Sequence, residues 1–380
     1  MAGENRTLQY REKMDSSSIP NNIILNLTQI EELRYGENPG QAAKFFVESG
    51  KKSSFEVIKS GKGGMSATNW LDVCRGYDLL KHFDDSSVAV MKHGVPSGVA
   101  SEYTDRTSQR DIYVASRNCD IRSAFGSVVA FNKPLTVEAA NELSKYFIEA
   151  VLAPEFEEGV LGILTKKADI RAIITPNSSN LPKYEEDEDD RIFLTTLPGG
   201  LILAQKPYMT GIKTHNDIQN SYEIANSDGH SISLIKSANE EQLKEMEFAW
   251  KVNFGVRSNG IVFTKDRKTL AIGTGEQERV GAVEQAIVKA YQKHASLHNI
   301  DFNSLNGISD LEKIISPLQG SICSSDAFFP KPDSIETMAR VGVAGVIQPG
   351  GSKGDYSIVK AINENNMVLG LSDKRCFGHF

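Results

Sequence analysis

The chain has 380 residues and a formal net charge of −7, and 40% of its residues are hydrophobic. This length allows two or three domains, and the apolar content is enough for a sizeable core. The negative charge argues against general affinity for nucleic acids, because no basic surplus is available to neutralise phosphates.

The first twenty residues are polar, and we expect residues 1–20 to form a flexible N-terminal arm. They lack the apolar segment of a signal peptide, and no stretch approaches the roughly 18 apolar residues of a membrane span. The four cysteines, Cys74, Cys119, Cys323 and Cys376, form no CxxC pair. We therefore expect reduced thiols packed as small apolar residues, in a cytoplasmic protein with neither nucleic-acid nor membrane partners.

Beyond the arm, short apolar runs alternate with helical patterns, which predicts an α/β fold. Strands are predicted over residues 87–91, 127–132, 172–174, 200–204, 260–264, 269–272 and 344–348. Helices are predicted over residues 68–81, 136–152, 240–254, 279–294, 334–342 and 355–363. The acidic run 183–191 indicates a solvated linker or surface loop, so we place two halves at residues 21–190 and 191–380.

A lysine and a histidine, Lys92 and His93, are adjacent where the first predicted strand ends. Open α/β sheets bind ligands beyond the carboxyl ends of their strands, so the pair is a candidate for proton transfer. The residues alone are explained equally well by a buried neutral histidine beside an outward-pointing lysine.

A glycine-rich turn, IGTGEQERVGAVEQAI from Ile272, follows a predicted strand and opens a helix. Gly273 and Gly275 would let the backbone approach a ligand, and Arg279 in the first helical turn indicates an anionic partner. Glu278 stands where a dinucleotide fingerprint has its third glycine. A plain strand–helix turn remains the alternative.

Other segments carry weaker signals. The loop at residues 350–354, GGSKG, matches a nucleophile elbow, but too little chain follows for an acid and a histidine. A loop whose N–H groups face a ligand is the better interpretation there.

His294 and His298 have a spacing that can bind zinc, but no HExxH glutamate lies between them, which favours solvated side chains. Either Phe328 or Phe329 could stack on a planar ligand, or both could be core residues.

Taken in order, ten motifs resemble the AICAR transformylase domain of the bifunctional purine-biosynthesis enzyme. They are LRYGENPGQ, ATNWLD, MKHGVPSG, SAFGSVVAFN, APEFEEGVLGIL, SNGIVF, IGTGEQERV, SDAFFPKPDS, IQPGGS and KRCFGHF. The resemblance covers nearly all of the chain after residue 20, and an ordered set is far more specific than any one member. The cyclohydrolase domain that would precede Leu33 is not recognised, so a stand-alone transformylase is expected.

The resemblance implies two tandem cytidine-deaminase-like subdomains, each a mixed sheet with flanking helices, and a homodimer with shared active sites. It also implies formyl transfer from 10-formyltetrahydrofolate, a co-substrate, to the 5-amino group of AICAR in IMP biosynthesis. By the same resemblance, the catalytic residues are Lys92, His93 and Asn259. Those that bind AICAR are Arg34, Tyr35, Asn69, Gly126, Glu149, Arg279, Phe328 and Arg375. Those that bind folate are Val280, Asp333, Gly350 and Gly351.

No catalytic metal is implied, although Ser258 and Asp326 match the positions of a structural potassium ion in relatives. The sequence departs from the usual family pattern at Gly40, Val95, Arg122, Lys331 and Gly378. These departures affect the folate side most. They leave open another formyl donor, or a non-catalytic protein that binds AICAR or another nucleotide.

Overall fold

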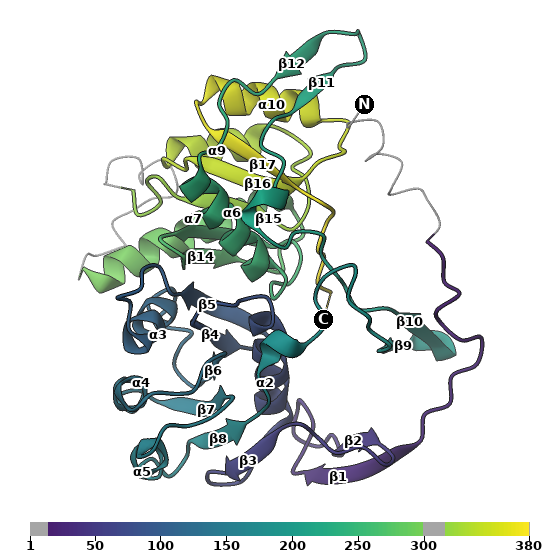
Figure 1. Cartoon of the computed structure of the whole chain (residues 1–380), viewed down its shortest axis with the longest axis vertical. Helices are drawn as coiled ribbons and strands as arrows, with labels where there is room; N and C mark the ends of the chain where they lie inside the picture. The colour runs from purple at the N-terminus through teal and green to yellow at the C-terminus, as the bar shows by residue number, and fades with distance from the viewer. Residues whose placement is uncertain (1–13, 299–315, 380) are drawn as a thin grey trace.

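The computed structural model describes residues 14–298 and 316–379, so most of the predicted arm at residues 1–20 lies outside the described residues. Eleven strands form one mixed sheet (Figure 1). Their order across the sheet is β17 (Val368–Ser372), β16 (Gly345–Pro349), β15 (Ile322–Ser325), β13 (Ile261–Lys265), β14 (Lys268–Gly273), β5 (Val95–Ser101), β4 (Ser87–Lys92), β6 (Ser127–Phe131), β7 (Ile148–Ala153), β8 (Arg171–Ile174) and β3 (Glu56–Lys59). The prediction of an α/β fold with mixed pairing is confirmed.

Helices cover both faces of the sheet. The helices in the described part of the chain are α2 (Ala67–Leu80), α3 (Gln109–Arg117), α4 (Val137–Leu143), α5 (Val160–Leu164), α6 (Glu240–Asn253), α7 (Arg279–Leu297), α9 (Asp333–Arg340) and α10 (Asp355–Glu364). Helices α2 and α6 share one apolar core with the sheet, whereas α3, α4, α7, α9 and α10 contribute to cores that contain other sheet residues. In β4, Ala89 and Met91 belong to the core of α2, and Val88 and Val90 to that of α3. This alternation is the period-two pattern of a strand buried on both faces.

The two halves of the sheet repeat the same topology. In the first half, β4 forms a hairpin with β5, pairs antiparallel with β6, and is followed by the parallel strands β6, β7 and β8. In the second half, β13 forms a hairpin with β14 and pairs antiparallel with β15. The strands β15, β16 and β17 are then parallel to one another. The halves meet where β14 pairs antiparallel with β5, so they build one continuous sheet. The limits 21–190 and 191–380 remain predictions.

The predicted helix over residues 136–152 is wrong in its second half. Helix α4 begins after Thr136, whose side chain caps the Ala139 N–H, and it ends at Leu143. Residues 148–153 instead form β7, which is parallel to its neighbours and buried along nearly its whole length. A short apolar run buried on both faces has no strand alternation, so its pattern does not distinguish a strand from a helix.

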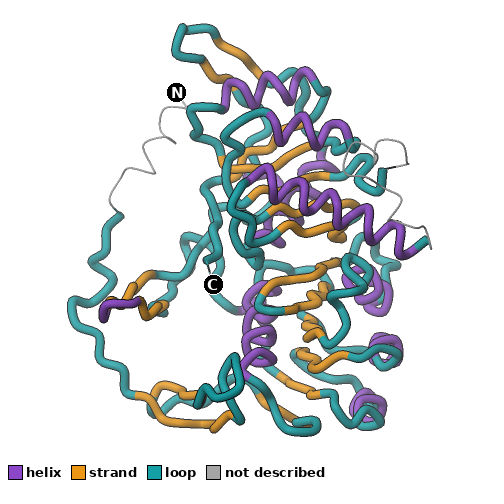
Figure 2. The backbone as a smooth tube through the Cα atoms, turned by 180° about the vertical axis from the view of Figure 1, so that it is seen from behind, coloured by secondary structure: helices purple, strands orange, loops and turns teal. Residues whose placement is uncertain are grey.

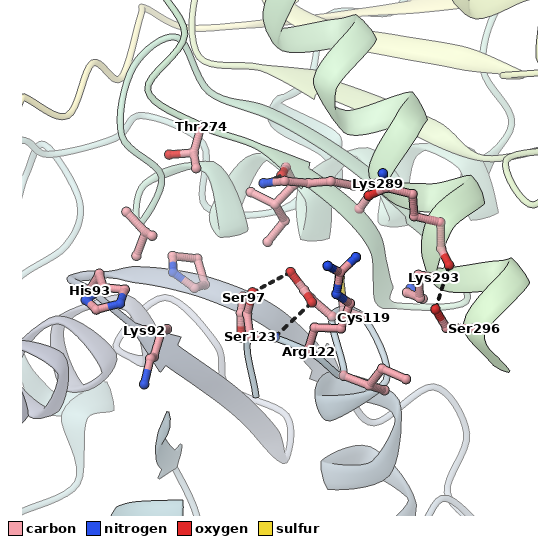
Figure 3. A pocket seen from close by; sticks show the side chains of 17 residues that line it. Lys92, His93, Ser97, Cys119, Arg122, Ser123, Thr274, Lys289, Lys293 and Ser296 are labelled. Carbon is pink, nitrogen blue, oxygen red and sulfur yellow. Dashed lines mark hydrogen bonds between the residues drawn. The ribbon is translucent and has the colours of Figure 1, made fainter. Parts of the chain in front are cut away.

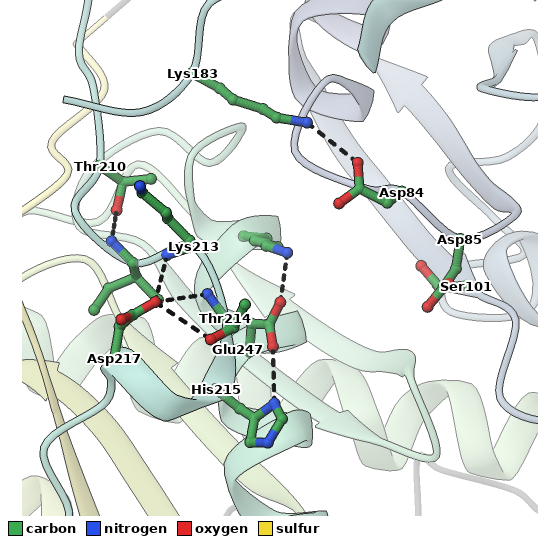
Figure 4. A network of polar contacts seen from close by, with 12 residues as sticks. Asp84, Asp85, Ser101, Lys183, Thr210, Lys213, Thr214, His215, Asp217 and Glu247 are labelled. Atoms are coloured by element: carbon green, nitrogen blue, oxygen red, sulfur yellow. Dashed lines mark hydrogen bonds and ion pairs between the residues drawn. The ribbon is translucent and has the colours of Figure 1, made fainter. Parts of the chain in front are cut away.

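The acidic run 183–191 contains no helix or strand, as predicted, yet it is anchored to the body. Lys183 is buried, and its amine donates to Lys81 O at 2.9 Å and to the Asp84 carboxylate at 3.2 Å (Figure 4). The Asp187 carboxylate accepts the N–H groups of Lys183 and Tyr184. Backbone turns and one buried lysine therefore fix a segment whose composition indicates only solvation.

Two hairpins stand away from the sheet (Figures 1 and 2). They are β1 (Leu27–Leu33) with β2 (Ala43–Glu48), and β9 (Phe193–Leu197) with β10 (Leu201–Gln205). A third small hairpin pairs β11 (Glu223–Ala225) with β12 (Ser231–Ser233). Apolar side chains are exposed along the first two hairpins, hereafter the two hairpin arms, with Ile30 of β1 51% and Leu201 of β10 65% exposed. These arms hold apolar surface that the described chain does not cover.

The cysteines are free thiols. Cys119, Cys323 and Cys376 are buried as predicted, but Cys74 is exposed on α2, which corrects the prediction for that residue. Among the described residues, no helix is long and apolar enough to cross a membrane.

Candidate functional site

Most of the candidate residues lie along one edge of the large sheet. Strand β4 is antiparallel to β6 and to β13, so the end of β4 lies at the same edge as the beginnings of β6 and β13. Strands β14, β15 and β16 also end at this edge. Loops at such an edge can combine residues from distant parts of the sequence around one ligand.

A first group surrounds the Lys92 amine. This amine donates to Gly126 O at 2.6 Å and to Phe125 O at 3.2 Å. A Cβ atom at Gly126 would lie 3.3 Å from the Lys92 amine and 3.6 Å from Glu149 Oε1, and Gly126 has a φ of +65°. The Asn69 amide on α2 donates to the Glu149 carboxylate. The structure therefore brings together Asn69, Lys92, Gly126 and Glu149, and it explains why a glycine is required at 126.

His93 is exposed in the two-residue turn between β4 and β5, where His93 and Gly94 have φ values of +57° and +80°. Positive φ at both positions is the geometry of a type I′ hairpin turn, which a glycine accommodates well. Val95, which departs from the family pattern, pairs with Lys92 across the hairpin. A β-branched residue suits that strand position.

Asp72 on α2 is the residue that the sequence analysis missed. Its carboxylate accepts the Gly94 N–H at 2.6 Å, so it holds the turn that carries His93. Burial raises the pKa of Asp72, although the backbone of Gly94 and His93 and the charges of His93 and Lys92 oppose this. The spacing of Asp72 in the helix could have indicated this role. Asp72 lies with Asn69 and Val73 on the buried side of α2, and a buried polar side chain needs a hydrogen-bond partner.

A second group centres on Arg279 at the beginning of α7. Its guanidinium donates to Asp326 Oδ1 at 2.5 Å, to Ser325 Oγ at 2.8 Å and to Asn259 Oδ1 at 2.6 Å. The Asn259 amide in turn donates to Glu276 O and Gln277 O, both at 3.0 Å. The anionic partner expected for Arg279 is thus present within the chain as Asp326, whose side chain is fully buried.

The same aspartate bears on the potassium expectation. Asp326 Oδ2 accepts the Gly260 N–H at 2.9 Å and the Ser258 hydroxyl, while Oδ1 is held by Arg279. Three donors of the chain thus already occupy this carboxylate, and a potassium ion there remains a prediction. Within residues 14–298 and 316–379, no cluster of three or more His, Cys, Asp or Glu side chains suits a metal ion.

Three predicted AICAR residues lie around these groups. Arg34 and Tyr35 follow β1 on the surface, and the Arg34 guanidinium stacks 4.9 Å from the Tyr35 ring. A Cβ atom at Gly63, close to the beginning of α2, would lie 3.9 Å from a nitrogen of the Arg34 guanidinium. Arg375 stacks 4.7 Å from the Phe377 ring, and the Arg279 guanidinium lies 6.0 Å from that ring. Arg375 therefore belongs beside the second group.

The predicted folate residues lie after the end of β16 and at the beginnings of α7 and α9. Gly354 packs on Pro330, because a Cβ atom at 354 would lie 2.7 Å from Pro330 O, so the two loops touch. The expectation that the N–H groups of the 350–354 loop face a ligand is wrong for three of them. Those of Gly351 and Ser352 donate to the Asp355 carboxylate at 2.8 and 3.2 Å, and that of Gly354 donates to Ser352 Oγ at 3.0 Å.

The remaining predicted folate residues begin helices, and the two candidate aromatic residues differ in burial. Asp333 is the first residue of α9 and accepts the Ser334 N–H at 2.7 Å, and Val280 is the second residue of α7. Phe329 is fully buried in the core, whereas Phe328 is only partly buried. Of the two aromatics, only Phe328 is therefore partly accessible to solvent.

The first and second groups do not touch within one chain. Strands β14 and β5 separate β13 from β4, which corresponds to three strand spacings, or roughly 14 Å. Reacting groups need to approach within about 3–3.5 Å. Lys92 and Asn259 of a single chain are therefore too far apart to hold the same pair of reacting atoms.

Comparison with known families agrees with this arrangement of motifs. The family model described as the AICARFT/IMPCHase bienzyme matches residues 5–289. The chain belongs to this family. Relatives named "Bifunctional purine biosynthesis protein PurH" include those of Caldicellulosiruptor saccharolyticus, 32% identical over 368 residues, and Acetivibrio thermocellus, 30% identical over 372 residues. These alignments cover 95% and 97% of this chain but 62% and 63% of the relatives.

The relative from Rippkaea orientalis is also 32% identical over 368 residues, with 96% of this chain and 62% of that protein covered. The chain therefore spans somewhat under two thirds of the length of these relatives.

In this member of the family, the first group and the adjacent His93 offer an amine, an imidazole, a carboxylate and an amide at one end of β4. Such a set can orient a polar heterocycle and move protons.

Proposed function

We propose that the chain transfers the formyl group of 10-formyltetrahydrofolate to the 5-amino group of AICAR, which gives FAICAR and tetrahydrofolate in purine biosynthesis. Membership of the bienzyme family supports the reaction class. The observation that carries the proposal is the pair at the end of β4, with the Lys92 amine held by two carbonyls and His93 exposed in the turn beside it.

The reaction explains why such a pair is needed. The 5-amino group of AICAR is a poor nucleophile, because its lone pair is delocalised toward the carboxamide, so it must lose a proton as it attacks the formyl carbon. A neutral imidazole can accept that proton near pH 7, which is the role we assign to His93. The Lys92 ammonium would stabilise the oxyanion and supply a proton to the departing folate nitrogen. The tetrahedral intermediate then collapses to FAICAR and tetrahydrofolate.

We assign substrate binding to the neighbouring side chains. Asn69 and Glu149 would hydrogen-bond the carboxamide and ring of AICAR, with Gly126 leaving room for them. The exposed guanidiniums of Arg34 and Arg375 suit a ribose phosphate, since a guanidinium can donate two parallel hydrogen bonds to one phosphate. Arg279 is already paired with Asp326, so we expect it to position Asn259 and to contact the substrate only with its remaining N–H groups.

We further propose a homodimer whose active sites combine residues from both chains. The roughly 14 Å between β4 and β13 supports this, because Asn259 of a second copy could reach a Lys92–His93 pair that its own chain cannot complete. The exposed apolar side chains of the two hairpin arms supply surface for such an association.

The proposal is tested by incubating the purified protein with AICAR and 10-formyltetrahydrofolate and following tetrahydrofolate formation. We expect AICAR-dependent turnover. A parallel reaction with formate and ATP tests the second candidate, a different formyl donor, which the internally bound N–H groups of the 350–354 loop favour. Turnover only with formate and ATP would replace the folate assignment. Tight AICAR binding without turnover from either donor would show a non-catalytic protein.

A further inference from the structure

The sheet opens between its two halves. Strands β5 and β14 pair at Ala100 and Lys268, and the Thr269 hydroxyl bonds Val99 N and O at 2.9 and 3.1 Å. Toward the edge that carries the candidate site, no further backbone pairing joins these two described strands. A cavity of about 510 Å³ occupies this opening (Figure 3). Its volume lies within the range of small-molecule sites.

Two lysines of α7 line the cavity and bind the unpaired edge of β14. The Lys289 amine donates to Ile272 O at 3.0 Å, and the Lys293 amine donates to Leu270 O at 2.7 Å. They lie four residues apart and therefore on one face of the helix. Each ammonium has three N–H donors, so each retains two after bonding its carbonyl.

The charge of the cavity is not balanced by the side chains around it. Arg122 adds a third cation, and no described residue forms an ion pair with Lys289, Lys293 or Arg122. The acid among the lining residues, Asp120, has its carboxylate oxygens bound by the Ser123 N–H at 3.0 Å and hydroxyl at 2.7 Å. Burial lowers the pKa of Lys293, although the charge of Asp120 opposes this shift.

We propose that this cavity binds a small multivalent oxyanion, such as a phosphate ester or a polycarboxylate, between Arg122 and the two lysines of α7. A guanidinium and two ammonium groups that converge with free donors are the recognition chemistry of such anions. The bound anion would join the 119–123 segment of the first half to α7 of the second. It would thus supply a link where the strands themselves have separated.

The cavity adjoins the proposed substrate group, because Lys92 and His93 are among the residues that line it. The Lys92 side chain, however, points away from Arg122 and Lys289 in Figure 3, toward the carbonyls of Phe125 and Gly126. Arg122, Lys289 and Lys293 are not among the residues to which we assign a part in formyl transfer. The site therefore goes beyond the proposed formyl transfer, and its occupancy does not depend on that reaction.

The test is calorimetric titration of the full chain with inorganic phosphate and, separately, with citrate. We expect saturable binding of at least one anion, weakened about tenfold or more by Arg122→Gln and by Lys293→Met. Lys265→Met is the matched control, because the exposed Lys265 amine also donates to a backbone carbonyl, Gln319 O at 2.9 Å, but lies outside the cavity. This control should bind within about twofold of wild type.

The two anions distinguish the two classes of ligand, a phosphate ester and a polycarboxylate. Binding of phosphate alone indicates a phosphate ester, and binding of citrate alone indicates a polycarboxylate. Absence of saturation by either anion up to about 10 mM would overturn the proposal. So would equal weakening by the Lys265 control, or unchanged affinity in Arg122→Gln. No hydrogen bond joins Arg122 to another residue in the described part of the chain, so the Arg122→Gln variant decides the matter even if Lys293→Met fails to fold.

Discussion

Asp72 shows how one side chain connects a helix to the proposed chemistry. Its carboxylate binds the Gly94 N–H, and its charge lies close to those of Lys92 and His93. The positions of Lys92 and His93 follow from an apolar run that ends before a glycine turn. The contribution of Asp72 depends on α2 crossing β4, and only the tertiary structure shows this.

Replacement of Asp72 gives a prediction about stability. Asp72→Ala leaves the buried Gly94 N–H without its acceptor, so the free energy of unfolding should fall by about 1–3 kcal/mol. Asp72→Asn retains an acceptor oxygen and should lose less. Urea denaturation of the two variants measures the difference, and equal losses would contradict the assigned role of the hydrogen bond.

The pH dependence of Asp72→Asn follows from linkage. Burial raises the pKa of Asp72 above its ordinary 3.8 in the folded chain, so its stabilising contribution is complete below that value and is lost as pH rises through the folded pKa. The stability of Asp72→Asn relative to wild type should therefore improve as the pH rises from 4 through the folded-state pKa of Asp72. Denaturation midpoints measured at pH 4, 5, 6 and 7 check the sign. A constant or falling difference would contradict it.

Among the secondary-structure elements, the turn from β14 to α7 has a different use from the one that its glycines predict. A Cβ atom at Gly273 would lie 2.3 Å from Ala282 O, so this glycine permits α7 to pack closely on β14 rather than a ligand to approach. The interpretation as a plain strand–helix turn, left open by the sequence, is the better one for Gly273.

Gly273→Ala should therefore destabilise the protein by about 1–3 kcal/mol, because either α7 or β14 must shift. Gly162→Ala on α5 is the matched control, since a Cβ atom there meets nothing within 4 Å and helical alanine is favoured by about 0.5–1 kcal/mol. Thermal unfolding of both variants distinguishes them. A neutral Gly273→Ala would show that the contact is not constraining.

The sequence pattern predicts the buried elements better than the exposed ones, for a physical reason. Central strands such as β4 and β13 contain short apolar runs, VAVM and IVF, and amphipathic helices such as α6 begin at recognisable caps. The strands of the arms carry exposed polar and apolar residues in mixed order, so β1 and β9 were not predicted. Side-chain groupings such as Asn69 with Glu149 depend on long-range pairing and were expected only by family resemblance.

At the scale of the whole molecule, the two halves share a topology although no short internal repeat is visible in the sequence. Both hairpins have a two-residue turn with positive φ, at His93–Gly94 and at Asp266–Arg267. The antiparallel meeting of β5 and β14 directs these turns to opposite edges of the sheet. Only one of the two turns therefore lies at the edge that carries the candidate site.

The shared-site homodimer predicts complementation between inactive variants. Lys92→Ala and Asn259→Ala chains, mixed by reversible dissociation, should recover about a quarter of wild-type activity, because half of the dimers are mixed and each has one intact site. Co-purification of the untagged variant with an affinity-tagged copy of the other establishes that mixed dimers form. No recovery despite mixed dimers would show that each chain completes its own site.

The central claim is that Lys92 and His93 move protons during formyl transfer. It is tested most directly by measuring kcat and AICAR affinity together for Lys92→Ala and His93→Ala, with Lys265→Ala as a control outside the site. We predict kcat losses of about 10²–10⁴-fold with AICAR affinity nearly unchanged, because groups that act in the transition state affect kcat more than ground-state binding. Variants that both retain near wild-type kcat would contradict the account.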